Sequence, residues 1–244
     1  MISLRGEVVR IYFPPDANTL LAVADHCLRS RDYVNLIVID KQPQLQYLGY
    51  EEAVAHARAG ASRWDWAGNR ADEPDLVLAA AGDIPTMEIV AAADLFRRYV
   101  PELGVRVVNV VDLMTIFTPD IHPHGLPEDR FRHLFGDDLE VVFAFHGYAR
   151  ALHQLLHGRP RPERFHVRGF NEQGTTTTPF DMVVLNEMSR YHLVLEGLRR
   201  APRRPPGAAE LEAHCREMLT RHHAYVREHL EDMPEVRDWS LGKA

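Results

Sequence analysis

The sequence predicts an α/β protein, built on a mostly parallel sheet with helices on both faces. Short apolar runs recur along the chain and are continuous rather than alternating, which is typical of strands buried on both faces of a sheet. Helical patterns separate these runs, as the crossovers of a parallel sheet require. An apolar content of 45% in 244 residues is enough for a substantial core. We therefore expect one large domain, or one domain with a smaller unit beside it.

Six apolar runs are candidates for strands. Four of them lie between helical patterns and are typical of buried parallel strands. Another run, near the N-terminus, ends abruptly at Pro14-Pro15, and a short run precedes Gly169. In chain order the predicted strands are residues 8–13, 34–39, 76–81, 105–111, 141–145 and 165–168.

Helices are predicted between these strands and after the last of them. Asp16 or Asn18 can begin the first helix, because either side chain can accept from free backbone N–H groups. A Pro- and Arg-rich break at residues 201–207 precedes the last helix, which is polar and typical of a solvated surface. These predicted helices are residues 17–29, 86–99, 148–156 and 208–230.

One further helix is expected to begin at Pro179, directly after four consecutive threonines. Thr178 can act as its N-cap, proline suits the first helical position, and Asp181 places a carboxylate near the positive helix end. Apolar residues then recur at spacings of four and three, as on one face of a single helix. They are Val184, Met188, Tyr191, Leu195 and Leu198.

Charge and composition exclude several kinds of partner. The formal net charge is −7 and no basic face is concentrated, so we expect no nucleic acid partner. The arginines of residues 199–204 are expected to stabilise a helix C-terminus. No apolar run approaches the roughly 20 residues of a membrane span, and no signal-peptide pattern is present. Cys27 and Cys215 are expected to be free thiols of a soluble, cytoplasmic chain.

The stretch around the predicted helix at Pro179 resembles a known family. RGFNEQGTTTTPFDMVVLNEMSRYHLV resembles the C-terminal signature of the thiamine-diphosphate-dependent phosphoketolases that act on xylulose 5-phosphate and fructose 6-phosphate. The resemblance covers nearly the whole chain from Val8 onward and is similar to the last third of a phosphoketolase. Other stretches that resemble the family, in the same order, are VVRIYFPPDANTLLAVADHCLRSRDYVNLIVIDKQP, AAAGDIPTMEIVAAADLFRRYVPELGVRVVNVVDLM, HPHGL, FAFHGY and EDMPEVRDW.

The resemblance implies how the chain is divided. Phosphoketolases contain a diphosphate-binding domain, a pyrimidine-binding domain and a smaller C-terminal domain of the transketolase type. Residues 1–45 resemble the last β-α-β unit of the pyrimidine-binding domain, and residues 46–244 resemble the C-terminal domain. In the family this first unit completes a larger sheet. Strand residues 11–13 and 35–39 are therefore expected to leave apolar surface and unpaired edges exposed here.

The resemblance also implies the chemistry of the complete enzyme. There, thiamine diphosphate with Mg²⁺ cleaves a ketose phosphate, and inorganic phosphate takes the acetyl group to give acetyl phosphate and an aldose phosphate. The family's Gly-Asp-Gly stretch is absent, because Gly82-Asp83 and Gly136-Asp137 do not continue with glycine. The activating glutamate lies in a segment that this chain does not include. We expect no cofactor, metal or catalytic residue in this chain alone; its expected partners are the remaining phosphoketolase domains or a second copy.

Lys41 is the one residue that the resemblance places in the active-site channel. It follows the predicted strand 34–39, at an edge where open α/β sheets bind ligands, and it matches a family lysine that helps bind phosphate. Asp40 replaces a small residue there and would weaken phosphate binding. The alternative is an exposed lysine at a strand end. Gly82-Asp83 marks a similar turn, where a backbone N–H group could hold an anion but Asp83 opposes one.

Histidines are weaker candidates for chemistry. The pairs His122/His124 and His153/His157 have spacings that could suit a metal, but neither has further ligands nearby. His146 follows a predicted strand directly, and a structural role is expected for it. A second hypothesis on function remains open: a free-standing, non-catalytic α/β module that binds a small anionic metabolite or a partner enzyme.

Overall fold

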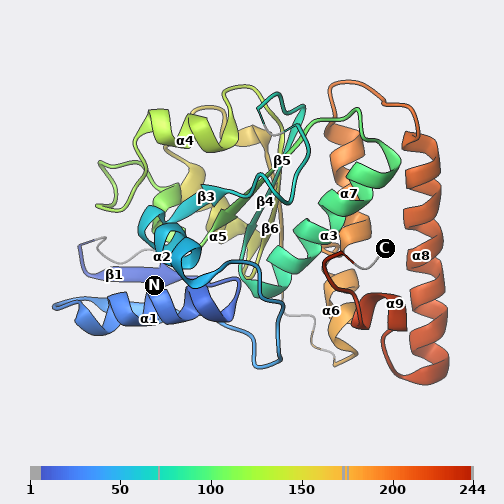
Figure 1. Cartoon of the computed structure of the whole chain (residues 1–244), viewed down its shortest axis with the longest axis horizontal. Helices are drawn as coiled ribbons and strands as arrows, with labels where there is room; N and C mark the ends of the chain where they lie inside the picture. Colours follow the sequence, from blue (N-terminus) through green and yellow to red (C-terminus); the bar gives the residue numbers. More distant parts are fainter. Residues whose placement is uncertain (1–6, 71, 172–173, 175, 243–244) are drawn as a thin grey trace.

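The computed structural model describes residues 7–70, 72–171, 174 and 176–242 of the chain (Figure 1). The fold is α/β, as the sequence predicts. In chain order the elements are β1 (Val9–Tyr12), α1 (Ala17–Arg29), β2 (Val34–Ile37), α2 (Tyr50–Ala59), β3 (Ala61–Arg63), β4 (Leu76–Ala81), α3 (Asp83–Tyr99), β5 (Val105–Val110), η1 (Leu113–Ile116), α4 (Glu128–Phe135), β6 (Val141–Phe145), α5 (Ala149–Leu156), η2 (Pro162–Arg164), β7 (Phe165–Gly169), α6 (Pro179–Leu185), α7 (Arg190–Arg200), α8 (Ala208–His229) and α9 (Pro234–Arg237).

Five strands form the main sheet, in the order β3-β5-β4-β6-β7. β4 pairs parallel with β5 and β6, and β7 continues parallel to β6. β3 runs antiparallel to β5, so the sheet is mostly parallel, as predicted. β4 and β6 have the predicted bounds because their apolar runs are buried from end to end.

Helices cover both faces of this sheet, and Figure 1 shows the sheet between them. α3, α7 and α8 pack over one core, while η1, α4 and α5 pack over the other. Successive side chains of β4 alternate between the two cores, as the pleat of a strand requires. Leu76, Leu78 and Ala80 enter the first core, and Val77, Ala79 and Ala81 enter the second. No helix of the described ranges is long and apolar enough to cross a membrane.

The N-terminal segment is a β-α-β unit with a sheet of its own. β1 and β2 pair in parallel, with Val9 opposite Val34. Of the two predicted caps, Asp16 begins α1, since its Oδ1 accepts from the backbone N–H of Thr19 at 2.8 Å. The unit joins the end of β5, because the backbone N–H of Phe13 donates to the carbonyl of Val111 at 2.7 Å.

The expected exposure of this unit is wrong for its first strand. Ile11, Tyr12 and Phe13 are 3 to 4% exposed. Val9, Ile11 and Phe13 join the core beneath η1 and α5, so residues of this same chain cover them. The second predicted strand does leave apolar surface exposed: Val34 at the start of β2 is 50% exposed, and Ile39, beyond the end of β2, is 51% exposed.

The predicted single helix from Pro179 through Leu198 is in fact two helices, α6 and α7. Glu187 has φ +50° and turns the chain between them. The first backbone N–H group of α7, on Arg190, donates to the buried Glu88 carboxylate of α3 at 2.6 Å. A side chain from another helix thus accepts from a free N–H group, and a new helix can begin here. Met188 and Tyr191 are still buried, as their spacing indicates.

The start of α6 also differs in detail from its prediction. Pro179 occupies the first turn, but the Thr178 side chain does not cap the helix. Asp232 takes this part instead: its Oδ2 accepts from the N–H of Phe180 at 3.0 Å and its Oδ1 accepts from the Thr178 hydroxyl. Part of the signature stretch, residues 172–173 and 175, lies outside the described residues. α2, β3 and α4 were not predicted, whereas α8 begins at the expected residue.

Candidate functional site

The loops after β2, β4 and β6 meet at one edge of the molecule. They carry Lys41, Asp83 and His146, three positions that the sequence singled out separately. Asp83 links the loops: its Oδ1 accepts from His146 Nδ1 at 3.0 Å, and its Oδ2 accepts from the backbone N–H of Asp40. Because these loops follow the carboxyl ends of parallel strands, they lie where open α/β sheets bind ligands.

Asp83 is a buried carboxylate with its acceptor positions in use. It is 4% exposed, and Oδ1 also accepts from the backbone N–H of Ile84 at 2.8 Å. Burial alone would raise the pKa of Asp83, but the hydrogen bonds from His146, Asp40 and Ile84 together lower it below its ordinary value. The carboxylate therefore stays charged and holds the Lys41 loop to β4.

His146 is placed by close packing on both sides. Gly82 has φ +112°, and a Cβ at this position would lie 2.5 Å from the Cβ of His146, so only glycine fits. On the other side the ring of Phe170 lies 5.3 Å from the imidazole, centroid to centroid. The structural role expected for His146 agrees with this arrangement. Phe170 was missed, because an aromatic residue after a short strand has no distinctive spacing.

Lys41 is exposed, as a lysine at a strand end can be. Its backbone N–H donates to Asp40 Oδ1 at 2.6 Å, and Gln44 Nε2 donates to Asp40 Oδ2 at 2.7 Å. The Asp40 carboxylate is therefore occupied by groups of its own loop. Phosphate binding by Lys41 itself stays a prediction.

A buried chain of hydrogen bonds runs behind the site. Ser62 donates to His56 Nδ1 at 2.7 Å, and His56 Nε2 donates to Asn109 Oδ1 at 2.8 Å. Asn109 Nδ2 donates to Thr86 Oγ1 at 2.8 Å, and Thr86 donates to the carbonyl of Gly82. Burial lowers the pKa of His56 to about 4, although the bond to Asn109 opposes this shift. The neutral imidazole thus accepts from Ser62 and donates to Asn109, and this fixes the direction of each hydrogen bond as far as Gly82.

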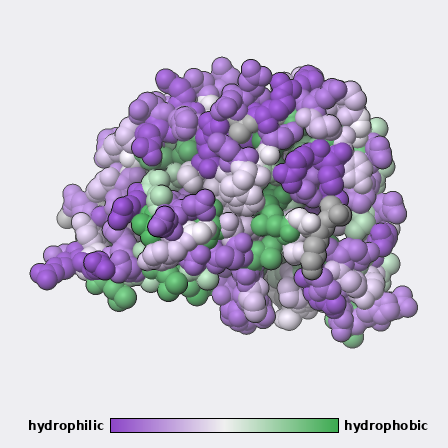
Figure 2. All heavy atoms as spheres, in the orientation of Figure 1, coloured by the Kyte–Doolittle hydropathy of each residue, from purple (hydrophilic) through white to green (hydrophobic). Residues whose placement is uncertain are grey.

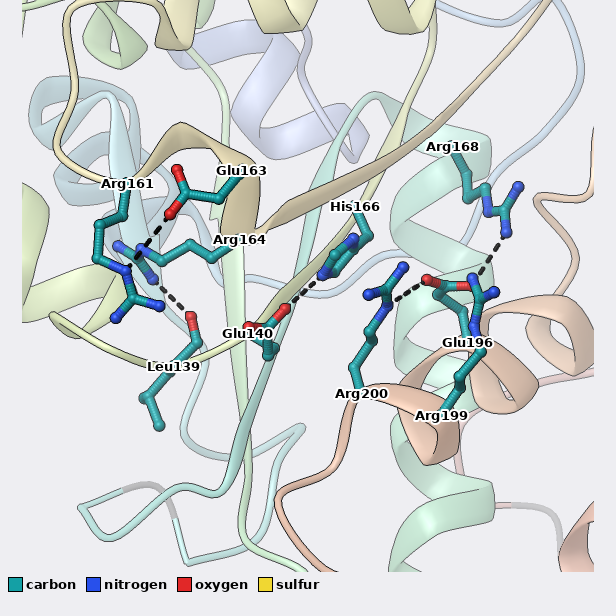
Figure 3. Close-up of polar contacts among 10 residues, drawn as sticks. All are labelled: Leu139, Glu140, Arg161, Glu163, Arg164, His166, Arg168, Glu196, Arg199 and Arg200. Carbon is teal, nitrogen blue, oxygen red and sulfur yellow. Dashed lines mark hydrogen bonds and ion pairs between the residues drawn. The ribbon is translucent and has the colours of Figure 1, made fainter.

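The arginine cluster at residues 199–204 neutralises acidic groups. Figure 3 shows Arg168 of β7 with Arg199 and Arg200 of α7 around the carboxylate of Glu196. Burial would raise the pKa of Glu196, but the three guanidinium groups lower it to about 2. Arg203 and Arg204 pair with Asp75 and Glu212. The predicted role at a helix end is therefore incomplete, because Arg203 and Arg204 also tie the segment after α7 to Asp75, just before β4, and to Glu212 of α8.

The histidines of the pair His122/His124 form hydrogen bonds with other groups of the chain. His122 Nε2 donates to the carbonyl of Val9 at 3.1 Å, and its Nδ1 accepts from the N–H of His124 at 3.0 Å. His153 on α5 and His157 just after its end are both exposed. The described ranges contain no group of three or more histidine, cysteine or acidic residues placed to hold a metal. Cys27 and Cys215 are free thiols, as predicted.

Within the described residues, the two Gly-Asp pairs do not form a site for thiamine diphosphate. Gly82-Asp83 is the Gly-Asp pair at a strand end, yet both oxygens of Asp83 are occupied by His146 and backbone N–H groups. Asp137 of the other pair forms an ion pair with Arg132 at 2.6 Å. The buried Asp83 carboxylate is therefore not free to hold Mg²⁺ and a diphosphate, and Asp137 lies on the surface in an ion pair.

Comparison with protein families gives two matches along the chain. A family model described as the XFP C-terminal domain matches residues 41–241. A model described as D-xylulose 5-phosphate/D-fructose 6-phosphate phosphoketolase matches residues 1–30. A probable phosphoketolase of Rhodopseudomonas palustris is 54% identical over 240 residues, which are 98% of this chain and 31% of the relative. One from Chlorobaculum tepidum is 49% identical over 241 residues, 98% of this chain and 30% of the relative.

Several solved transketolases have a similar fold. A transketolase of Pichia stipitis matches 79% of this chain and 25% of its own, with a TM-score of 0.58 and 15% identity. The transketolase of Leishmania mexicana matches with a TM-score of 0.57, 17% identity, and coverage of 82% and 26%. A split-gene transketolase, described as an "inactive beta4 tetramer", matches with a TM-score of 0.55 and 16% identity. The match covers 79% of this chain and 59% of that chain. At these identities the likeness shows the fold alone, and it is transketolase-like.

Proposed function

Because the chain belongs to the D-xylulose 5-phosphate/D-fructose 6-phosphate phosphoketolase family, we propose that it serves as the C-terminal part of an enzyme that cleaves ketose phosphates with inorganic phosphate. The products are acetyl phosphate and an aldose phosphate, and the reaction belongs to carbohydrate metabolism in the cytoplasm. The match over residues 41–241 carries this proposal. The chain spans about 30% of the length of the curated relatives, so the other domains supply the remaining residues.

The role proposed for this chain is structural and substrate-binding. Thiamine diphosphate supplies the carbanion chemistry of the complete enzyme and is held by residues of the other domains. Lys41 binds a phosphate group of the sugar phosphate or inorganic phosphate, as a compact charge with three donors. Asp83 supports Lys41 by accepting from the N–H of Asp40, which holds the loop against the β4 edge.

The exposed side of the N-terminal unit is the proposed assembly surface. Leu21, Leu28 and Val34 are 59%, 87% and 50% exposed. Apolar side chains gather along the lower edge of the surface in Figure 2, where α1 lies in Figure 1. Within the described residues β2 pairs with β1 on one side, which leaves its other edge open to another strand. The remaining phosphoketolase domains, or a second copy of the chain, cover this surface.

A fusion tests the proposal directly. The chain replaces the matching C-terminal segment of the Rhodopseudomonas palustris relative, and acetyl phosphate formation is measured. The fusion is expected to be active, whereas the 244-residue chain alone neither makes acetyl phosphate nor binds thiamine diphosphate with Mg²⁺ in titration calorimetry. Micromolar cofactor binding by the chain alone would contradict the proposal.

The same fusion tests Lys41. The Lys41→Ala variant is expected to raise KM for inorganic phosphate or the sugar phosphate by about tenfold, with a smaller change in kcat, because a charged hydrogen bond to phosphate contributes about 1.5 kcal/mol. Lys41→Arg should restore part of the loss, and Arg216→Ala on α8 is the matched control. Unchanged kinetics of Lys41→Ala would remove this residue from the site.

A further inference from the structure

A groove of about 1020 Å³ lies between α1, α2 and the segment that leads into α4. Its walls are separate from the Lys41 loop, and its volume is enough for a metabolite of moderate size. The side chains that matter are two arginines and one buried tyrosine. We propose that this groove binds a phosphate-bearing small molecule.

The rim of the groove is cationic. Arg58 of α2 and Arg130 of α4 line it, both are exposed, and neither has a side-chain hydrogen bond or ion pair within the residues that the structure describes. Arg29 of α1 also lines it and pairs with Asp25 at 2.9 Å. Guanidinium groups match the geometry of phosphate oxygens and can donate two hydrogen bonds at once. Two uncommitted arginines on one groove therefore favour an anion.

The floor of the groove contains an unsatisfied donor. Tyr12 is 3% exposed and lines the groove, and its hydroxyl has no hydrogen-bond partner in the described part of the chain. Burial raises the pKa of Tyr12, and the nearby Asp112 raises it further, so the phenol keeps its proton and can donate. A buried hydroxyl without an acceptor costs free energy, which a ligand oxygen would recover.

The one buried carboxylate at the floor has its oxygens occupied by hydrogen bonds. Asp112 is 3% exposed, its Oδ1 accepts from the N–H of Met114 at 2.9 Å, and its Oδ2 accepts from His124 Nδ1. The remaining acidic side chain, Asp25, is paired with Arg29. Three arginines line the groove against two carboxylates, Asp25 and Asp112, so arginine charge is in excess. A phosphate group brings a charge between −1.5 and −2 near neutral pH, as phosphoryl groups on side chains do.

Titration calorimetry of the 244-residue chain with pyrophosphate tests this inference, with citrate as a comparison of equal or greater charge. Pyrophosphate should bind saturably and more tightly than citrate. Arg58→Ala and Arg130→Ala should each raise its Kd at least fivefold, and the double variant should show no saturable binding. Tyr12→Phe should raise Kd about threefold.

Arg216→Ala is the matched control, because Arg216 is an exposed arginine of α8 that does not line the groove. It should leave the Kd within twofold, and circular dichroism should show that every variant folds. Absence of binding by the wild-type chain, an unchanged Kd in the Arg58 and Arg130 variants, or tighter binding of citrate would overturn the inference. The titration involves no phosphoketolase activity, so its failure leaves the proposed function standing.

Discussion

β1 and β2 form one parallel ladder, yet they differ sharply in burial. Val9 and Val34 are register partners, but Val9 is 3% exposed and Val34 is 50% exposed. β1 lies against the core that β6, η1 and α5 build, whereas β2 lies on the outside of the unit. The apolarity of a strand therefore does not decide its burial. Its burial depends on which other elements of the chain pack against it.

Phe13→Ala is expected to have the largest effect on the difference in burial between β1 and β2. The Phe13 ring meets Phe145 of β6 edge to face, with centroids 5.3 Å apart, and Phe13 is 4% exposed. Its loss should lower the free energy of unfolding by about 3 to 5 kcal/mol, measured by urea denaturation. Hydrogen exchange of β1 should accelerate towards that of β2. Leu28→Ala, at a side chain that is 87% exposed, is the control, and an equal cost for both variants would contradict the shared core.

Acid should lower the stability of the chain through His56, which lies on α2 and is hydrogen-bonded to Asn109 of the main sheet. Burial lowers the pKa of His56 from 6.5 to about 4, so between these values the unfolded chain binds a proton that the folded chain does not. Stability should therefore fall as the pH falls through this window, by about 2 kcal/mol between pH 7.5 and pH 5. Urea titrations of wild type and His56→Gln at both pH values check this. The loss of unfolding free energy between the two pH values should be smaller in His56→Gln than in the wild type. An equal loss in both proteins would exclude His56 as the source.

A matched pair of substitutions measures the difference between the strands directly. Val9→Ala should lower the free energy of unfolding by about 1.5 to 2 kcal/mol, because two buried methyl-sized groups are lost. Val34→Ala removes the same atoms at an exposed position and should cost less than about 0.5 kcal/mol. Urea denaturation gives both values. In the assembled fusion the difference in cost between Val9→Ala and Val34→Ala should become smaller, because β2 is then covered. An unchanged difference would show that β2 stays exposed.

Lys41→Ala should have the smallest effect on stability. The side chain is exposed beyond the end of β2, so the change in the free energy of unfolding is expected to stay within about 0.5 kcal/mol. Asp83→Asn is the informative contrast, because it weakens the acceptor that holds the loop by the N–H of Asp40. It should destabilise the chain by more than Lys41→Ala in the same urea assay. The reverse order would show that Asp83 does not anchor this loop.

Local pattern was a good guide wherever an element is covered on all sides. The continuous apolar run of β4, residues 76–81, ends where the strand ends. The spacing after Pro179 was right about Met188 and Tyr191, whereas Val184, Leu195 and Leu198 are only partly buried and the chain forms two helices instead of one. Glu88, about a hundred residues earlier in the chain, accepts the N–H of Arg190 and starts a new helix there. A spacing pattern contains no information on such a distant partner.

The sequence by itself determined the fold class, most strands and helices, the two free thiols and the family resemblance, because apolar periodicity and motif wording are local properties. Only the tertiary structure decided that Asp83 pairs with His146, 63 residues apart, and that Asp83 holds the loop of Lys41. It also decided that β1 is buried and β2 is not. Burial and hydrogen-bond partners depend on which distant segments meet, and that is set when the whole chain packs.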